Sequence, residues 1–379
     1  MKLDETKLKV IGFDRVKIYV ELISVNTDKN PNAYGIATEM ATLGYKVFNE
    51  ATNDYCKLNS FKFKKIITGE NIEENDKDNI IYGLELSRDK RKVILDIVLP
   101  RMVYGTIHNV YNVSNKEEVT KAMEMLIIGL GVEGIEINPI EEWEVFSLEV
   151  NKTIVADEPL VYYRKDLNWL FDEALDKGYV NEISEYRKRL LDNDISNTLR
   201  FDTKRIKGKI YSKSSQIKDQ LKLFVEENLI RLELTYDKEA IQRAFGYNGL
   251  YDIFDKDKME KSYNKATSKL IKYLNEFTEE KIRNLEGKFE CANYKAINKV
   301  YKENITDIYD ILFLVEASRR VYKKEKNNKF SRDIKKLLKS YDRSLENRYN
   351  ELRKILIAFN DTIEATNFDN VEKYLPKNK

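Results

Sequence analysis

The sequence predicts an α+β protein in which a sheet-based domain is followed by an all-helical C-terminal domain. Up to about residue 250, short runs rich in β-branched and aromatic residues alternate with stretches of helical periodicity. After Gly249 the periodicity is helical throughout, and no proline occurs between Pro159 and Pro376. The length of 379 residues is enough for two ordinary hydrophobic cores. We therefore expect an α/β domain at 1–250 and a helical domain at 251–379.

The expected elements of the first domain follow from period-two and period-3.6 patterns that are separated by polar turns. Strands are expected at 16–23, 60–67, 80–86, 92–99, 143–150, 206–213 and 229–236. Helices are expected at 116–130, 166–178, 182–191 and 216–228.

Composition restricts the class of protein. Lys and Arg total 66 and Asp and Glu total 64, so the net charge is only +2 and a nucleic-acid surface must be local. Cys56 and Cys291 are far apart and form no CxxC motif, which argues against a disulfide framework or a thiolate zinc site. No signal peptide and no apolar run of about 18 residues is recognisable. We expect a soluble cytoplasmic protein that does not enter a membrane.

The strand at 206–213 carries an unusual tyrosine. Because side chains alternate along a strand, one face is expected to hold Arg205, Lys207, Lys209, Tyr211 and Lys213. Between residues 200 and 222 there are eight Lys or Arg and two Asp, a local charge of +6 that suits a phosphate backbone. A solvated lysine face with one ordinary tyrosine is the alternative, since the chain has 24 tyrosines.

Two other strands place a carboxylate on a polar face. In 143–150, Phe146 and Leu148 are expected to face the core and Glu149 to face away. In 229–236, Leu232 and Leu234 are expected inside, and Arg231 and Glu233 outside. The single histidine, His108, lies in the run YGTIHNVYN. Solvent-facing carboxylates that pair with Arg231, and a surface histidine, remain the alternatives.

An ordered set of motifs between about residues 85 and 255 resembles the filamentous-phage replication endonucleases, the gene-two protein family, and more distantly the plasmid rolling-circle initiators. The resemblance rests on an acidic strand residue, a His-Asn-apolar-aromatic loop, an apolar-Tyr-x-Lys strand, an Arg-x-Glu strand and a helix that ends in Phe-Gly. The matching positions are Asp96, 107–112, Ser147 to Glu149, 210–213, 231–233, Phe245 and Gly246. The loop glycines of the family are replaced here, and Gln216 stands in place of an acid.

The resemblance implies a ferredoxin-like or relaxase-like nicking domain. Tyr211 would be the nucleophile, with Lys213 as its catalytic partner. A divalent Mg²⁺ or Mn²⁺ ion would polarise the scissile phosphate, because carboxylates and an imidazole suit such ions. The implied metal ligands are His108, Glu149 and Glu233. The implied DNA-binding residues are Lys204, Arg205, Lys207, Lys209 and Asn109.

The expected function is initiation of rolling-circle replication, by metal-dependent nicking and rejoining of origin DNA through a 5′-phosphotyrosyl intermediate. The implied partners are single-stranded or cruciform origin DNA and a host helicase, and the helical domain would serve DNA recognition or interaction. A homodimer, and the choice between phage and plasmid replicons, are left open. A non-catalytic origin-binding protein that recruits replication factors is the alternative.

Overall fold

The computed structural model describes residues 10–25, 46–49, 61–66, 80–86, 92–104, 110–132, 134–176, 198–202, 205–290 and 343–361, and single positions at 8, 313, 314, 317, 320 and 321. The chain divides into two compact units. The first comprises Met1–Tyr162 and Leu175–Tyr263, and the second comprises Tyr163–Ala174 and Asn264–Lys379. The expected boundary at residue 250 differs from this division, which also assigns part of one helix of the first half to the second unit.

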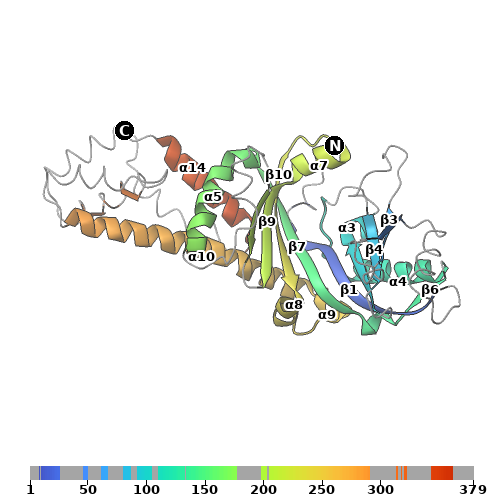
Figure 1. Cartoon of the computed structure of the whole chain (residues 1–379). Coiled ribbons are helices and arrows are strands. Elements are labelled where there is room, and N and C mark those ends of the chain that lie inside the picture. Colours follow the sequence, from blue (N-terminus) through green and yellow to red (C-terminus); the bar gives the residue numbers. More distant parts are fainter. Residues whose placement is uncertain are drawn as a thin grey trace. The chain divides into compact units, whose positions relative to one another are not determined.

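Unit 1 is built on a single antiparallel sheet, in which the order β2-β3-β4-β5-β1-β7-β10-β9-β8 is formed and β6 pairs with the end of β1 (Figure 1). The strands are β1 Gly12–Val25, β2 Lys46–Asn49, β3 Phe61–Ile66, β4 Ile80–Leu86, β5 Lys92–Val98, β6 Ile135–Ile137, β7 Glu144–Ala156, β8 Thr198–Asp202, β9 Ile206–Ser212 and β10 Asn228–Asp237.

The helices of this unit follow strand ends. They are α3 Leu99–Tyr104, α4 Lys116–Val132, the 3₁₀ helix Ile140–Glu142, α7 Lys213–Leu221, α8 Lys238–Phe245 and α9 Leu250–Ile253. Helix α7 lies at one end of β9 and β10 and α8 at the other (Figure 1). The α8 N-terminus is capped by Asp237, whose carboxylate accepts a 2.8 Å bond from the Ala240 amide, and the helix ends at Gly246 with φ 95°.

One face of the sheet carries the apolar core. The rings of Phe13 and Phe254 pack edge to face with their centroids 4.9 Å apart, and the Tyr263 hydroxyl donates to the backbone oxygen of Leu232 at 3.2 Å. Tyr263 lies on α10, Lys256–Glu290, whose first residues therefore cover this face. Fully buried strand residues on this face include Val16, Ile18, Leu148, Ile210, Leu232 and Leu234. Burial of such side chains contributes about 25 cal/mol per Å² of apolar surface, and it leaves the opposite face free for polar groups.

The α+β class is confirmed, and all seven expected strands are present, β4 with the expected limits and the other six with shifted ends. The helices expected at 116–130 and 166–178 correspond to α4 and to α5, Leu160–Asp176. The expected helix at 216–228 is wrong in its limits. Ser212 caps α7 by accepting from the Ser215 amide, and Lys222 ends the helix in the left-handed region at φ 54°. The helix expected at 182–191 lies outside the described residues.

In unit 2 the described elements are helical. They are most of α5, α10 from Asn264 onward, and α14 Arg343–Ala358. The Asn360 amide, just after α14, donates to the Asn264 backbone oxygen and to Thr267 Oγ1, both at 2.8 Å. Most of 291–342 lies outside the described residues, so an all-helical C-terminal domain remains a prediction. Among the described helices, none has the length and apolar character needed to cross a bilayer.

Candidate functional site

The polar face of the sheet brings together rows of charged side chains from neighbouring strands. In an antiparallel pair, residues directly opposite each other point to the same face. Glu233 of β10 lies opposite Lys209 of β9, and Arg231 lies opposite Tyr211. On the other side of β10, Glu149 of β7 lies opposite Thr235, two positions along β10 from Glu233. The two predicted acids and the predicted nucleophile therefore share one face of the sheet.

A third acid reaches this face through an irregularity in β1. Phe13 pairs with Val150 and Arg15 pairs with Glu149, so Asp14 is an additional residue between two consecutive pairs. Such a β-bulge bends the strand and redirects the side chain of the extra residue. Asp14 is thereby turned toward Glu149, although its neighbour Phe13 points into the apolar core.

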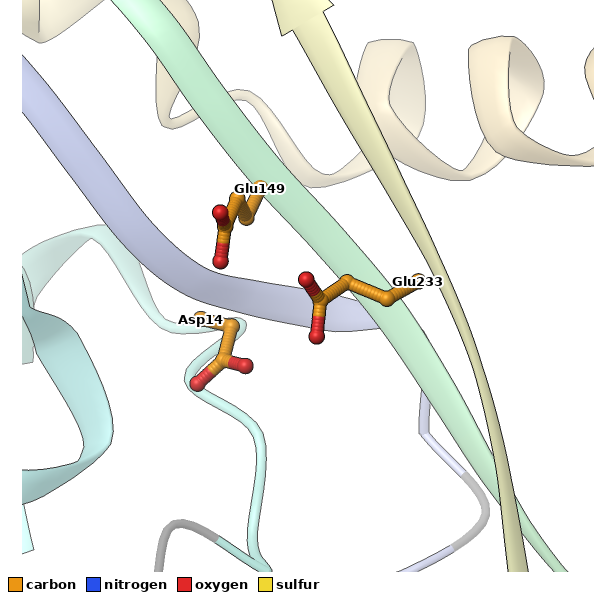
Figure 2. Close-up of side chains that lie close together, drawn as sticks. All are labelled: Asp14, Glu149 and Glu233. Atoms are coloured by element: carbon orange, nitrogen blue, oxygen red, sulfur yellow. The ribbon is translucent and has the colours of Figure 1, made fainter. Parts of the chain in front are cut away.

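The three acids form a tight cluster. One carboxylate oxygen each from Asp14, Glu149 and Glu233 lie within 4.8 Å of one another, and Figure 2 shows the carboxyl groups converging from three parts of the sheet. Asp14 is 3% exposed and Glu233 is 1% exposed. Grouped carboxylates repel one another strongly when water is excluded, so the cluster requires compensating positive charge.

Arg231 supplies part of that charge from a fully buried position. Its Nη1 lies 3.3 Å from Asp14 Oδ2, its Nε donates to Thr153 Oγ1 at 2.8 Å, and its Nη2 donates to the Val110 backbone oxygen at 2.8 Å. A guanidinium suits this role because its donors have a fixed planar geometry. Arg231 therefore holds the bulge of β1, strand β7 and the chain at Val110 in one arrangement.

Lys209 supplies the second compensating charge. Its ammonium group forms an ion pair with Glu233 and lies 5.6 Å from the centre of the Tyr211 ring. Burial lowers the pKa of Lys209, but the opposing effects of the Glu233 and Glu149 carboxylates are larger in sum, and the pKa is raised. The lysine is therefore a stable counter-ion of the carboxylate cluster.

The Tyr211 hydroxyl points into the cluster, where it donates to Glu233 Oε2 at 3.2 Å. Tyr211 is 7% exposed. Burial and then the Glu233 charge raise the pKa of Tyr211 well above its usual value, against the opposing effect of Arg231. The phenol is protonated at neutral pH in this arrangement, and its ionisation requires further positive charge beside the carboxylates.

Glu149 is the carboxylate whose ionisation is least favourable. Burial, followed by the charge of Glu233, raises its pKa to about 8, although Lys209 and Arg15 act in the opposite direction. When all three carboxylates are ionised, their negative charge exceeds the positive charge of Arg231 and Lys209. A divalent cation would supply the missing positive charge and so remove the cost of ionising Glu149. Carboxylate oxygens are the preferred ligands of hard cations such as Mg²⁺ and Mn²⁺. Asp14, Glu149 and Glu233 are the residues that could hold such an ion.

Not every residue predicted for the site has a described position. His108, Asn109 and Lys204 lie outside the described residues.

The cationic face predicted around Tyr211 is present in part: Lys207, Lys209 and Tyr211 share one face of β9, but the strand does not extend to Lys213. The strand ends at Ser212, so Lys213 begins helix α7, where it is 2% exposed and donates to Gln216 Oε1 at 2.7 Å. Burial and the nearby Arg231 charge lower the pKa of Lys213 well below its usual value. Arg205 pairs with Glu239 at 2.6 Å. Lys207 is exposed.

Arg231 and Glu233 point away from the face of Leu232 and Leu234, as predicted, but neither faces solvent, because both are almost completely buried. One prediction of side-chain direction is wrong. Phe146 does not enter the core: the β1–β7 register shifts beside it, and its ring stacks on Tyr19 with a centroid distance of 4.1 Å. Asp96 forms a bidentate pair with Arg15, with both N···O distances at 2.6 Å.

Asp14 is the site residue that the sequence reasoning missed. The first strand was expected to begin at Val16, after Asp14. The available signal was the acid in the run GFDRVKIYVEL, where Phe13 breaks the alternation that continues through Val16 and Ile18. An apolar spacing of three within a strand indicates a bulge at the intervening residues.

Neither the family models nor the curated proteins compared include a match to this sequence. Among solved structures, this chain is similar to one described as Methanococcus jannaschii TBP, with 13% sequence identity and a TM-score of 0.24. The similarity covers 66% of this chain and 99% of that chain. A TM-score this low supports no conclusion about fold or function.

Proposed function

We propose that the protein initiates rolling-circle replication by nicking and rejoining origin DNA with Tyr211, assisted by a divalent metal ion. One observation carries the proposal: the Tyr211 hydroxyl is hydrogen-bonded to Glu233, a member of the three-carboxylate cluster. A potential nucleophile, a proton acceptor and a set of hard-cation ligands thus occupy one place. The motif resemblance to replication endonucleases supports the same reading.

The proposed chemistry is a phosphoryl transfer. Tyr211 Oη forms a bond to the scissile phosphorus while the bond from phosphorus to the 3′-oxygen breaks. The phenolic proton passes to Glu233, and the departing 3′-oxygen takes a proton from water to become a hydroxyl group. The product is a 5′-phosphotyrosyl ester, and attack on it by a 3′-hydroxyl reverses the step and rejoins the strand. A bound Mg²⁺ or Mn²⁺ would supply charge stabilisation at the phosphate oxygens.

The positive residues have distinct proposed roles. Lys209 is near enough to the Tyr211 ring to stabilise a phenolate once its Glu233 partner is engaged elsewhere. Exposed Lys207 lies on the same face two positions along β9, and with Arg205 it would contact the DNA backbone. A catalytic part for Lys213 remains a prediction. Recognition of the origin by the C-terminal helices, and contacts with a host helicase, belong to the same proposal.

The non-catalytic alternative is favoured by one specific observation. With 7% exposure, the Tyr211 side chain is accessible to a phosphate only after the groups that cover it move. A protein that only binds origin DNA would need no such movement, and in that case the buried cluster would be structural. Formation of a covalent bond between the protein and DNA distinguishes the nicking function from DNA binding alone.

The test uses 3′-labelled single-stranded oligonucleotides of randomised sequence with Mn²⁺, because the proposed ester joins the protein to the 3′ fragment. The wild-type protein should form a labelled adduct that survives denaturing electrophoresis. Tyr211→Phe should form none, whereas Tyr247→Phe, which changes a tyrosine that is 72% exposed, should match the wild type. Adduct formation by Tyr211→Phe at the wild-type level would refute the assignment. DNA binding by wild type without any adduct would establish the non-catalytic alternative.

A further inference from the structure

Asn151 stands beside the carboxylate cluster, on the same face of the sheet. It lies between Glu149 and Thr153 on β7, two positions from each, and its register partner on β10 is Glu233. The β7–β10 register has no shift between Ser147 and Ala156, so these side chains share one direction. On the other side of β7, the register partner of Asn151 is Gly12, which has no side chain to occupy this position.

The side-chain amide of Asn151 is unsatisfied within the part of the chain that the structure describes. The residue is 0% exposed, and neither its Oδ1 nor its Nδ2 has a hydrogen-bond partner among the residues that the structure describes. Its backbone oxygen accepts a hydrogen bond from Asn112 Nδ2 at 3.1 Å. An unsatisfied buried polar group costs about 1–3 kcal/mol, and native proteins contain few of them. A ligand that binds the amide would remove this cost.

We infer that Asn151 Oδ1 is a fourth ligand of a hard divalent cation held by Asp14, Glu149 and Glu233. This inference rests on the metal site of the proposed function and adds a residue to it. A carbonyl oxygen is a suitable ligand for Mg²⁺, Mn²⁺ or Ca²⁺. It also completes the set without a fourth negative charge, which the low exposure of the site would make costly.

An all-oxygen ligand set has a consequence for metal choice. Carboxylate and amide oxygens suit hard cations such as Mg²⁺ and Mn²⁺, whereas thiolate ligands favour softer ions. The four proposed ligands therefore suit Mg²⁺ and Mn²⁺ better than they suit copper or the zinc ion of a thiolate site. A cation held by Glu233 would repel the ammonium group of Lys209, which pairs with Oε1 of the same carboxylate.

The test measures Mn²⁺ affinity of the full chain by the paramagnetic resonance signal of free Mn²⁺. Asn151→Ala should weaken Mn²⁺ binding at least tenfold, while Asn151→Asp, which retains an oxygen ligand, should bind at least as tightly as wild type. Asn228→Ala is the matched control, since the Asn228 side chain donates to the Asp157 backbone oxygen at the end of β10, five positions along the strand from Glu233. Circular dichroism and Tm in EDTA establish that each variant is folded.

Two results would overturn the inference: wild-type affinity in folded Asn151→Ala, or a tenfold loss in folded Asn151→Asp. If Asn151→Ala does not fold, the Asn151→Asp result decides. Wild-type protein that binds no Mn²⁺ at millimolar concentration overturns both the inference and the metal part of the proposed function. Mn²⁺ binding that depends on Asn151, without any DNA adduct, supports the inference and overturns the nicking function.

Discussion

Lys209→Met is the substitution that most directly tests whether the carboxylate cluster is built for a cation. The change keeps the length of the side chain and removes the ammonium group that neutralises Glu233. Removing one partner of a buried ion pair costs about 3–5 kcal/mol. The Lys209 side chain is 35% exposed, so solvent screening reduces the expected loss to about 2 kcal/mol in the metal-free protein.

The same substitution should increase the affinity for a divalent cation, although it lowers the stability of the metal-free protein. A divalent charge about 5 Å from an ammonium group is repelled by about 1.7 kcal/mol even at the permittivity of water. Without Lys209, the Kd for Mn²⁺ should therefore fall by more than tenfold. At a concentration of about 100 times Kd, bound metal adds about 2.7 kcal/mol of stability, which offsets the loss caused by the substitution.

Urea denaturation in EDTA and in saturating Mn²⁺ gives the free energy of unfolding for both states. Lys207→Met is the control, because Lys207 is exposed on the same face and lies two residues away on β9. We expect Lys207→Met to leave both free energies within about 0.5 kcal/mol of wild type. Equal stability in EDTA and an equal Kd for wild type and Lys209→Met would refute the reasoning.

Three further predictions concern the same sheet. The pKa of Glu149 is raised from an ordinary 4.5 to about 8, so between these pH values the folded state holds a proton that the unfolded state lacks. The stability of the metal-free protein should therefore fall as pH rises through this window. Glu149→Gln should flatten a plot of Tm against pH. Arg231→Met should cost about 3–5 kcal/mol in urea denaturation by removing the buried ion pair with Asp14, and a loss under 1 kcal/mol would contradict this. Gly208→Ala should cost about 1–3 kcal/mol, because its Cβ would lie 2.0 Å from the Phe201 ring, and Phe201→Leu in the same chain should restore part of the loss.

The strands could be predicted from sequence because each carries its own alternation. That alternation also placed Glu149 and Glu233 on polar faces. Their proximity was not predictable, since it depends on β7 pairing with β10 across an interval of about 80 residues, and local patterns contain no information about partners. The full burial of Glu233 was missed for the same reason, because what covers a polar face is also a matter of long-range packing.

The errors near Tyr211 and Phe146 have local physical causes. The strand was extended through Lys213, although Ser212 is a favourable N-cap residue and its side chain does cap the following helix. At Phe146 and at Asp14 the register shifts, and each shift reverses the face on which later residues point. A strict period of two cannot reproduce such shifts, so Asp14 was left out of the predicted site.

The bulge at Asp14 makes assembly of the site depend on the last stages of folding. Asp14 and Arg231 are paired across 217 positions of the chain, and only one register of β1 against β7 directs Asp14 toward the other acids. Contacts this distant in sequence form late because their loop-closure entropy is large. An unfolded or partly folded chain therefore does not hold Asp14, Glu149 and Glu233 together, and the ability of this cluster to capture a cation should arise only together with the complete sheet.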